Sequence, residues 1–259
     1  MRKKGINSIE NKPFRSLKIG EGISLIIPVF NEEKTLETIV KRCSDQSTIK
    51  QLIIVDDGST DGSKVILNKI SKNFPSSRTA ALLTRKPLVT IIHHNKNLGK
   101  GVAIKTGLTK VQGKYVMVQD ADLEYYPEEI IGLFKKAEKS EDGIVFGSRS
   151  HNKKKGYILA QLGNWYLNLL FNSLFGFKLK DSYTCYKLIP SKVWREVNLQ
   201  SGGFEIDSEL VSKLGSRGYK IIEAPISYHP RKYSEGKKIK WLDVIKATTA
   251  ALKVKLFER

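Results

Sequence analysis

Short apolar runs alternate with amphipathic segments between residues 23 and 146 of the chain. Runs of strand length occupy residues 23–29, 51–55, 90–93, 115–119 and 143–146. Helical patterns lie between them at residues 32–43, 60–72, 101–111 and 127–139. Strands that alternate with helices are typical of a parallel sheet with right-handed crossovers. We therefore predict an α/β fold with a mostly parallel sheet flanked by helices, and an irregular segment over residues 73–89, which contain two prolines.

The regular alternation ends after residue 149. A stretch without charged residues covers positions 156–177, and its three asparagines recur every fourth residue, so they line one face of a helix. These are Asn164, Asn168 and Asn172; the other face carries Leu, Trp, Tyr and Phe. Because three amides argue against a membrane span, we expect this helix to pack on the protein or to lie in a membrane interface. A short helix from residue 191, a helix over 207–217 and a strand over 221–225 follow.

A terminal helix is predicted over residues 240–259. One stripe of this helix consists of Trp241, Ile245, Thr248, Leu252 and Leu256, while Lys246 and Lys253 lie off it. We divide the chain into a basic tail (residues 1–20), one folded domain (21–239) and a C-terminal amphipathic basic helix (240–259).

Polar clusters follow four of the predicted strands, at residues 31–32, 56–57, 95–101 and 120–122. Ligands of parallel sheets bind beyond the carboxyl ends of the strands, so these clusters should meet at one edge. Asp120 and Asp122 are two residues apart and can share a face. Two carboxylates suit Mg²⁺ or Mn²⁺, which take further ligands from substrate phosphates and water. A lone Asp-x-Asp pair is more often a solvated turn; the accompanying clusters favour a metal site here.

The charge balance narrows the class of partner. The chain has 45 Lys and Arg against 26 Asp and Glu, a net charge of +19, and both ends are the most basic parts. This favours a polyanionic partner (nucleic acid, anionic lipid or a phosphorylated substrate), with a merely solvated surface as the alternative. Two cysteines form no disulfide framework and fit a reducing compartment. No signal peptide is expected.

The order of five motifs resembles that of family 2 inverting glycosyltransferases. They are Ile-Pro-Val-Phe-Asn-Glu-Glu (27–33), Val-Asp-Asp-Gly-Ser-Thr-Asp-Gly (55–62), Asn-Leu-Gly-Lys-Gly (97–101), Asp-Ala-Asp (120–122) and Gly-Ser-Arg (147–149). Over roughly residues 21–240 the chain is most similar to the dolichyl- and polyprenyl-phosphate hexose synthase branch. The resemblance implies a GT-A-type, Rossmann-like single domain.

The resemblance also implies a donor site. It assigns nucleotide-sugar binding to Pro28, Asn31, Glu32, Asp57, Gly99, Lys100, Asp120, Ala121 and Asp122, with Asp120 and Asp122 holding Mg²⁺ or Mn²⁺. Independently of it, two glycines around Lys100 would let the backbone approach a ligand, and the lysine adds a charge for phosphate.

The residues needed at the acceptor side depend on which group of the acceptor attacks the sugar. The resemblance places Arg149, Asp181, Arg231 and Lys237 at the acceptor phosphate, and Asp122, Arg149, Asp207 and Arg231 in catalytic roles. A hydroxyl acceptor would need a base such as Asp207, whereas a lipid phosphate is already anionic at neutral pH. The family more often has Gly-Phe where this chain has Cys185-Tyr186, which leaves the shape of the sugar pocket open.

Three functions compete. The first is metal-dependent hexose transfer from a nucleotide-sugar, of the UDP-glucose type before GDP-mannose, to polyprenyl or dolichyl phosphate. The enzyme would then be cytoplasmic and peripheral on the inner membrane face, held by anionic lipid or by a membrane-protein partner. The second is a soluble transferase with a hydroxyl acceptor and Asp207 as base, since the C-terminal spanning helix common in the branch is lacking. The third is a basic nucleic-acid-binding protein. Acids at the strand ends would repel nucleic acid, so we expect no such partner.

Overall fold

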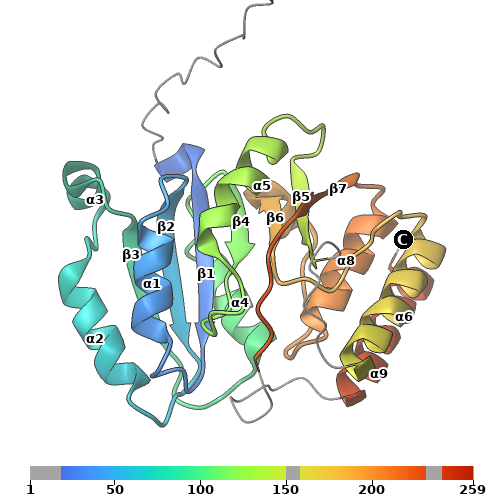
Figure 1. Ribbon diagram of the computed structural model, residues 1–259, viewed down its shortest axis with the longest axis horizontal. Coiled ribbons are helices and arrows are strands. Elements are labelled where there is room, and N and C mark those ends of the chain that lie inside the picture. The colour runs from blue at the N-terminus through green and yellow to red at the C-terminus, as the bar shows by residue number, and fades with distance from the viewer. Residues whose placement is uncertain (1–18, 150–157, 232–240, 259) are drawn as a thin grey trace, which may run out of the picture.

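One sheet of seven strands organises the part of the chain that can be described, in the order β3-β2-β1-β4-β6-β5-β7 (Figure 1). The structure, a computed structural model, describes residues 19–149, 158–231 and 241–258. The strands are β1 (Ile23–Val29), β2 (Ile49–Asp56), β3 (Leu88–His93), β4 (Tyr115–Val118), β5 (Ile144–Ser148), β6 (Lys187–Pro190) and β7 (Ile221–Pro225). Only β6, within this sheet, runs antiparallel to both of its neighbours. The predicted α/β fold with a mostly parallel sheet is therefore confirmed.

Helices flank the sheet. They are α1 (Leu36–Ser44), α2 (Ser63–Asn73), α3 (Arg78–Thr84), α4 (Lys100–Leu108), α5 (Ile130–Ala137), α6 (Ile158–Phe175), α7 (Ser191–Glu196), α8 (Ile206–Ser216) and α9 (Trp241–Phe257), with 3-10 turns η1 (Ile19–Glu21) and η2 (Pro127–Glu129). Side chains of β1 and β2 are almost wholly buried, as expected for parallel strands covered on both faces. This burial explains why both strands read as continuous apolar runs.

Two elements differ from the sequence-based prediction. Helix α3 lies inside the segment expected to be irregular; Ser77 Oγ caps it by accepting from the Ala80 N–H, and only Ala81 is buried, so no amphipathic pattern marks it. Strand β6 was not predicted because Lys187 opens it and Pro190 ends it. Both are nevertheless buried, since Lys187 finds a carboxylate partner inside the protein.

Helix α6 packs on the protein through its amide face, one of the two arrangements expected. The Asn168 and Asn172 side-chain amides donate to the carbonyls of Lys180 and Leu179 at 2.7 and 2.9 Å. Among the described helices, none combines the length and the apolar character that crossing a bilayer requires.

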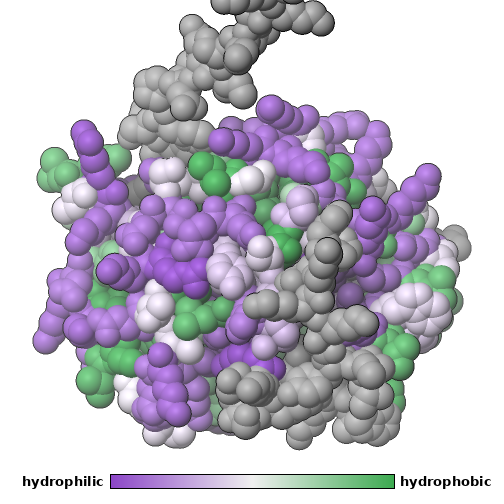
Figure 2. Space-filling model, viewed as in Figure 1, coloured by the Kyte–Doolittle hydropathy of each residue, from purple (hydrophilic) through white to green (hydrophobic). Residues whose placement is uncertain are grey.

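The large apolar stripe of α9 does lie on one face, but that face is exposed. Ile245 and Leu252 point to solvent, while Ala247 and Ala251 are buried against the protein. The Ser208 hydroxyl on α8 donates to the Ala247 carbonyl, an approach so close that only small side chains fit between the helices. In Figure 2 hydrophilic side chains cover much of the visible face, and green and pale ones gather at its right edge, beside α6 and α9. The side chain of Trp241 lies outside the described part of the chain.

Candidate active site

A cavity of about 230 Å³ lies at the carboxyl ends of the parallel strands, as the motif positions predicted. Its walls come from the loops after β1, β2, β3, β4, β5 and β7, from the loop before β6 and from the segment around the start of α8. The lining residues are Pro28, Val29, Phe30, Glu32, Asp57, Asn97, Gly99, Lys100, Ala103, Asp120, Ala121, Asp122, Glu124, Tyr125, Arg149, Tyr183, Cys185, Phe204, Asp207, Tyr228 and Arg231. Parallel strands direct these loops to one edge, which is why motifs far apart in sequence meet here.

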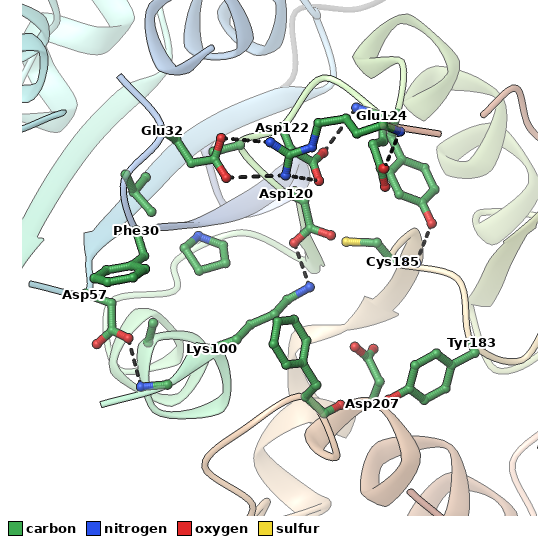
Figure 3. A pocket seen from close by; sticks show the side chains of 18 of the residues that line it. Phe30, Glu32, Asp57, Lys100, Asp120, Asp122, Glu124, Tyr183, Cys185 and Asp207 are labelled. Carbon is green, nitrogen blue, oxygen red and sulfur yellow. Dashed lines mark hydrogen bonds and ion pairs between the residues drawn. The ribbon is translucent and has the colours of Figure 1, made fainter. Parts of the chain in front are cut away.

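The two aspartates of the Asp-x-Asp motif face the middle of the cavity, and each has a cationic partner (Figure 3). Lys100 Nζ lies 2.6 Å from Asp120 Oδ1. Arg231 Nη2 lies 2.9 Å from Asp122 Oδ2, and Arg231 Nη1 lies 3.2 Å from Glu32 Oε2. The arginine therefore bridges the loops after β1 and β4 across the cavity.

These partners give the two aspartates different acidities. Burial raises the pKa of Asp120, but the ammonium of Lys100 outweighs it and brings that pKa below its ordinary value. Burial, together with the neighbouring charges of Asp120 and Glu124, raises the pKa of Asp122 to about 7, while Arg231 opposes the rise. In the protein alone, Asp120 is thus ionised at neutral pH and Asp122 only in part.

The residues of the cavity fit a divalent metal ion whose coordination shell is completed by the substrate. In the described ranges, no three His, Cys, Asp or Glu side chains are grouped so that they could hold a metal ion. The chain offers the two carboxylates, Asp120 and Asp122, beside a cavity. Mg²⁺ and Mn²⁺ are commonly held by one or two carboxylates, with phosphate and water oxygens completing the shell. A metal at this place would therefore bind together with a phosphorylated ligand.

Asp57 fixes the loop that carries Lys100. Its Oδ1 accepts from the Leu98 N–H at 2.9 Å and its Oδ2 accepts from the Gly99 N–H at 2.8 Å. His94 Nδ1 lies 2.7 Å from Asp57 Oδ1, so this histidine supports the cavity wall from behind. The two glycines serve packing against the chain as well as ligand approach. A Cβ at Gly99 (φ +98°) would meet the Gly202 carbonyl oxygen at 2.6 Å.

Arg149 is held by a buried carboxylate. Its Nε and Nη2 donate to Asp181 Oδ2 and Oδ1, both at 2.7 Å, which is the bidentate geometry of a strong charged pair. Asp181 is 2% exposed and lies behind the cavity wall. Burial raises the pKa of Asp181, but the hydrogen bonds and charge of Arg149 outweigh it, so that pKa lies below its ordinary value. Asp181 therefore positions Arg149, whose Nη1 also donates to the Tyr125 hydroxyl at 3.2 Å.

Asp207 lines the opposite wall and has a buried partner. Lys187 Nζ lies 2.8 Å from Asp207 Oδ1 and donates as well to the carbonyl of Thr184. The Tyr183 hydroxyl donates to the Phe204 carbonyl at 3.1 Å, which ties the loop before β6 to the loop before α8. A carboxylate oriented in this way can accept a hydrogen bond, or a proton, from a hydroxyl in the cavity.

The structure brings most of the predicted site residues together. Those lining the cavity are Pro28, Glu32, Asp57, Gly99, Lys100, Asp120, Ala121, Asp122, Arg149, Asp207 and Arg231. Asn31 and Asp181 do not line it: the Asn31 amide oxygen accepts from the Thr60 N–H at 2.8 Å and joins two loops. Lys237 lies outside the described residues.

Sequence reasoning missed several residues of the wall. Glu124 follows Asp122 by two residues, and that continued spacing was a usable signal; its Oε1 accepts from the Arg231 N–H at 2.7 Å. Tyr125, whose ring centroid lies 5.2 Å from that of Tyr228, carried no motif signal.

Comparison with known proteins decides the family. Residues 24–193 match the family model described as glycosyl transferase family 2. The chain belongs to glycosyltransferase family 2. It is therefore a glycosyltransferase, and the resemblance seen in the motifs is confirmed.

Curated relatives of this family 2 chain include transferases named for lipid phosphates. A dodecaprenyl-phosphate galacturonate synthase of Rhizobium johnstonii is 26% identical over 231 residues, covering 88% of this chain and 63% of the relative, so the chain spans less than two thirds of that length. A dolichyl-phosphate β-glucosyltransferase of Trichomonas vaginalis is 26% identical over 256 residues, covering 92% and 74%.

Solved structures show the same fold. Glucosyl-3-phosphoglycerate synthase of Mycobacterium tuberculosis, in complex with Mn²⁺, UDP and phosphoglyceric acid, superposes with a TM-score of 0.63. The identity is 18%, and the match covers 91% of this chain and 78% of that one. The predicted GT-A fold is confirmed by this likeness.

Proposed function

We propose that this glycosyltransferase transfers a hexose, with inversion, from a nucleotide-sugar to a polyprenyl phosphate at the cytoplasmic face of a membrane. The observation that carries the proposal is the pairing of two unlike ends in one cavity. Asp120, Asp122 and Lys100 line one part of it, with Arg231 paired to Asp122, and the guanidinium group of Arg149 reaches the same cavity from another part. One end thus suits a diphosphate that leaves, and the other suits a phosphate that attacks.

The donor end would bind the nucleotide between the loops after β1, β2 and β3. Pro28, Asp57 and Asn97 line the part that would receive base and ribose. Burial lowers the pKa of Lys100, but the charge of Asp120 outweighs it and keeps that pKa well above its ordinary value. Lys100 would therefore stay cationic beside the diphosphate. Mg²⁺ or Mn²⁺ held by Asp120 and Asp122 would supply charge stabilisation to the departing nucleotide diphosphate.

The acceptor end would hold the lipid phosphate with arginines. Arg149 is fixed by Asp181, and its guanidinium stays cationic: the charge and hydrogen bonds of its neighbours outweigh burial and keep its pKa well above the ordinary value. A phosphate monoester has a second pKa of about 6, so its oxygen attacks without a base. That oxygen forms the new bond to the anomeric carbon while the bond to the diphosphate oxygen breaks, and the anomeric configuration inverts.

The relatives support this choice of acceptor. Three curated relatives carry names that pair a sugar with dodecaprenyl, dolichyl or undecaprenyl phosphate. A UDP-sugar is consistent with the related glucosyl-3-phosphoglycerate synthase structures, which contain UDP with Mg²⁺ or Mn²⁺. We therefore propose a UDP-hexose of the glucose type as donor, with GDP-mannose as the next candidate.

Purified full-length protein tests the proposal when it is incubated with polyprenyl phosphate, Mg²⁺ or Mn²⁺, and a panel of UDP- and GDP-sugars. We expect a hexosyl phosphoryl-lipid, found by mass spectrometry, whose anomeric configuration is opposite to that of the donor. The highest rate is expected with a UDP-hexose. If no donor in the panel gives a glycolipid with either metal, the proposed function is wrong.

A second function is favoured by the place of Asp207 in the cavity wall. If the acceptor is a hydroxyl, Asp207 serves as the base, and Asp207→Asn should lower the rate about a hundredfold to ten-thousandfold. With a lipid phosphate acceptor we expect Asp207→Asn to keep the rate within about tenfold, because no proton has to be removed.

The matched control is Glu205→Gln. Glu205 is a nearby carboxylate whose Oε1 accepts from the Gly203 N–H at 3.0 Å, and it does not line the cavity. Initial rates of both variants with each acceptor class decide between the two functions. A collapse of lipid glycosylation in Asp207→Asn alone would contradict the proposed acceptor.

A further inference from the structure

Helix α6 exposes several large apolar side chains to solvent. Leu162, Trp165 and Leu169 are 56%, 64% and 52% exposed, and their spacing of three and four residues places them on one face. Leu167 and Phe171 are buried on the opposite side, where Leu170, Leu174 and Phe175 also pack against the core, while the three asparagines contact residues 179–182 of the following loop. Both faces of the helix are thus apolar, whereas the solvent face of an ordinary surface helix is polar.

Helix α9 extends this surface. The two helices lie side by side in Figure 1, and the Thr248 hydroxyl lies 3.4 Å from the Tyr166 hydroxyl. On α9, Ile245 and Leu252 flank Thr248 on one helical face and are exposed. We call the joint surface the α6–α9 face; its exposed apolar residues are Leu162, Trp165, Tyr166, Leu169, Ile245, Leu252, Leu256 and Phe257.

Charge indicates which partner this face fits. Helix α6 carries no charged residue, and lysines alternate with the apolar positions of α9 at Lys246, Lys253 and Lys255. Two carboxylates accompany them: Asp243 stands near the start of the helix sequence, and Glu258 follows the helix and is paired with Lys213 at 2.9 Å. A second copy of the face would bring lysines against lysines. An apolar layer covered by negative charge, as in an anionic bilayer, matches both the aliphatic stripe and the lysines.

The face is also connected to the acceptor end of the cavity. Asn164 on α6 donates to Asp181 Oδ1 at 3.3 Å, and Asp181 grips Arg149. The helix that exposes Trp165 is therefore one hydrogen bond away from the carboxylate that positions the acceptor arginine. A phosphate whose prenyl chain stays in the bilayer would arrive at this side of the cavity.

We propose that the α6–α9 face is a docking surface for an anionic lipid bilayer, with its aromatic and aliphatic side chains at the acyl boundary and its lysines among the headgroups. The biological role of this docking surface rests on the proposed function, in which the acceptor is a lipid phosphate. The binding itself involves neither donor nor acceptor and can be measured without them.

The test uses the full-length protein and vesicles of phosphatidylcholine, with or without phosphatidylglycerol. We expect flotation with the anionic vesicles, and weaker binding at high salt or without phosphatidylglycerol. In the triple variant L162Q/W165Q/L169Q the vesicle partition coefficient should fall by at least about tenfold, since each side chain loses burial in the lipid boundary. Glutamine keeps helix propensity, and thermal unfolding together with UDP binding verifies that the variant is folded.

The double variant V65Q/L83Q is the matched control, because Val65 and Leu83 are 73% and 81% exposed on α2 and α3, at the other end of the sheet. It should bind vesicles like the wild type. The inference is wrong if the wild type does not bind vesicles, if the triple variant binds as well as the wild type, or if the control falls equally. It is also wrong if the triple variant only abolishes self-association of the protein in the absence of lipid.

The two proposals fail separately. A protein that binds vesicles but glycosylates no lipid phosphate keeps the docking surface and loses the proposed function. A protein that glycosylates a water-soluble short-chain prenyl phosphate but ignores anionic vesicles keeps the function and loses the docking surface.

Discussion

Asp122→Asn should lower glycosyl transfer by at least about a thousandfold, because the loss of a Lewis acid held by this carboxylate removes several kcal/mol of transition-state stabilisation. Asparagine preserves the shape of the side chain but carries no charge. Calorimetric titration of Mn²⁺ in the presence of UDP should show weakened binding, which separates loss of the metal from a general loss of activity. Asp120→Asn is expected to behave similarly, since both carboxylates face one cavity.

The same substitution, Asp122→Asn, should not lower the folding stability of the metal-free protein, in contrast to its effect on the rate of transfer. The pKa of Asp122 is raised to about 7, chiefly by burial and then by the charges of Asp120 and Glu124. A carboxyl whose folded pKa lies above its unfolded value of about 3.9 destabilises the fold at every pH at which the unfolded group is ionised. Without metal at neutral pH, Asp122→Asn should therefore melt at the same temperature as the wild type or higher.

The control is Asp45→Asn, an exposed carboxylate outside the cavity, which should change neither the rate nor Mn²⁺ binding. An Asp122→Asn enzyme that binds Mn²⁺ and UDP with wild-type affinity would show that this aspartate is no metal ligand.

Asp181→Asn should destabilise the folded protein by about 3 kcal/mol or more, since it leaves a charged guanidinium beside a buried neutral partner. Asp181 is 2% exposed and makes two hydrogen bonds of 2.7 Å to the Arg149 side chain. Denaturant unfolding measures the loss. Transfer should weaken as well, because Arg149 would no longer be held toward the cavity.

The pH dependence of this loss has a defined sign. The pKa of Asp181 is below its ordinary value because the hydrogen bonds and charge of Arg149 outweigh burial. The stabilisation is then fully present above the unfolded pKa of about 3.9 and disappears as pH falls through the lower folded pKa. The gap between wild type and Asp181→Asn should be constant from neutral pH to about 5 and narrow only in stronger acid.

A second arginine–carboxylate pair provides the matched control. Arg42 binds Glu128 in the same bidentate manner at 2.9 and 2.7 Å, but the Glu128 side chain is 51% exposed. Glu128→Gln should cost no more than about 1 kcal/mol, as is typical of surface pairs. If Asp181→Asn costs no more than Glu128→Gln, the buried pair does not stabilise the fold as described.

The donor half of the site could be predicted from sequence because local and global rules agree there. The apolar runs of β1, β2 and β4 need burial on both faces, and parallel pairing then fixes the edge at which Asp57 and Asp120 emerge. No distant contact has to be known to place these residues together.

The acceptor half depends on partners that no local pattern announces. Lys187 is a charged residue that the sequence suggests should be exposed, yet Asp207, twenty positions later, allows it to open a buried strand. Likewise, the heptad-like stripe on α9 predicts one apolar face but not its direction. That direction is set by how closely Ala247 approaches α8. In both places tertiary contacts override what composition and periodicity indicate.

The antiparallel direction of β6 has a consequence for how such enzymes diversify. Because β6 runs antiparallel to β4 and β5, it starts at the cavity edge of the sheet, so the loop before it contributes Tyr183 and Cys185 to the cavity wall. Under the proposed function, the nucleotide would then be recognised mainly by the earlier stretch of the chain and the acceptor largely by the later one. Mutation or recombination in the later stretch can retarget the enzyme to another recipient without disturbing the inherited machinery for the activated sugar.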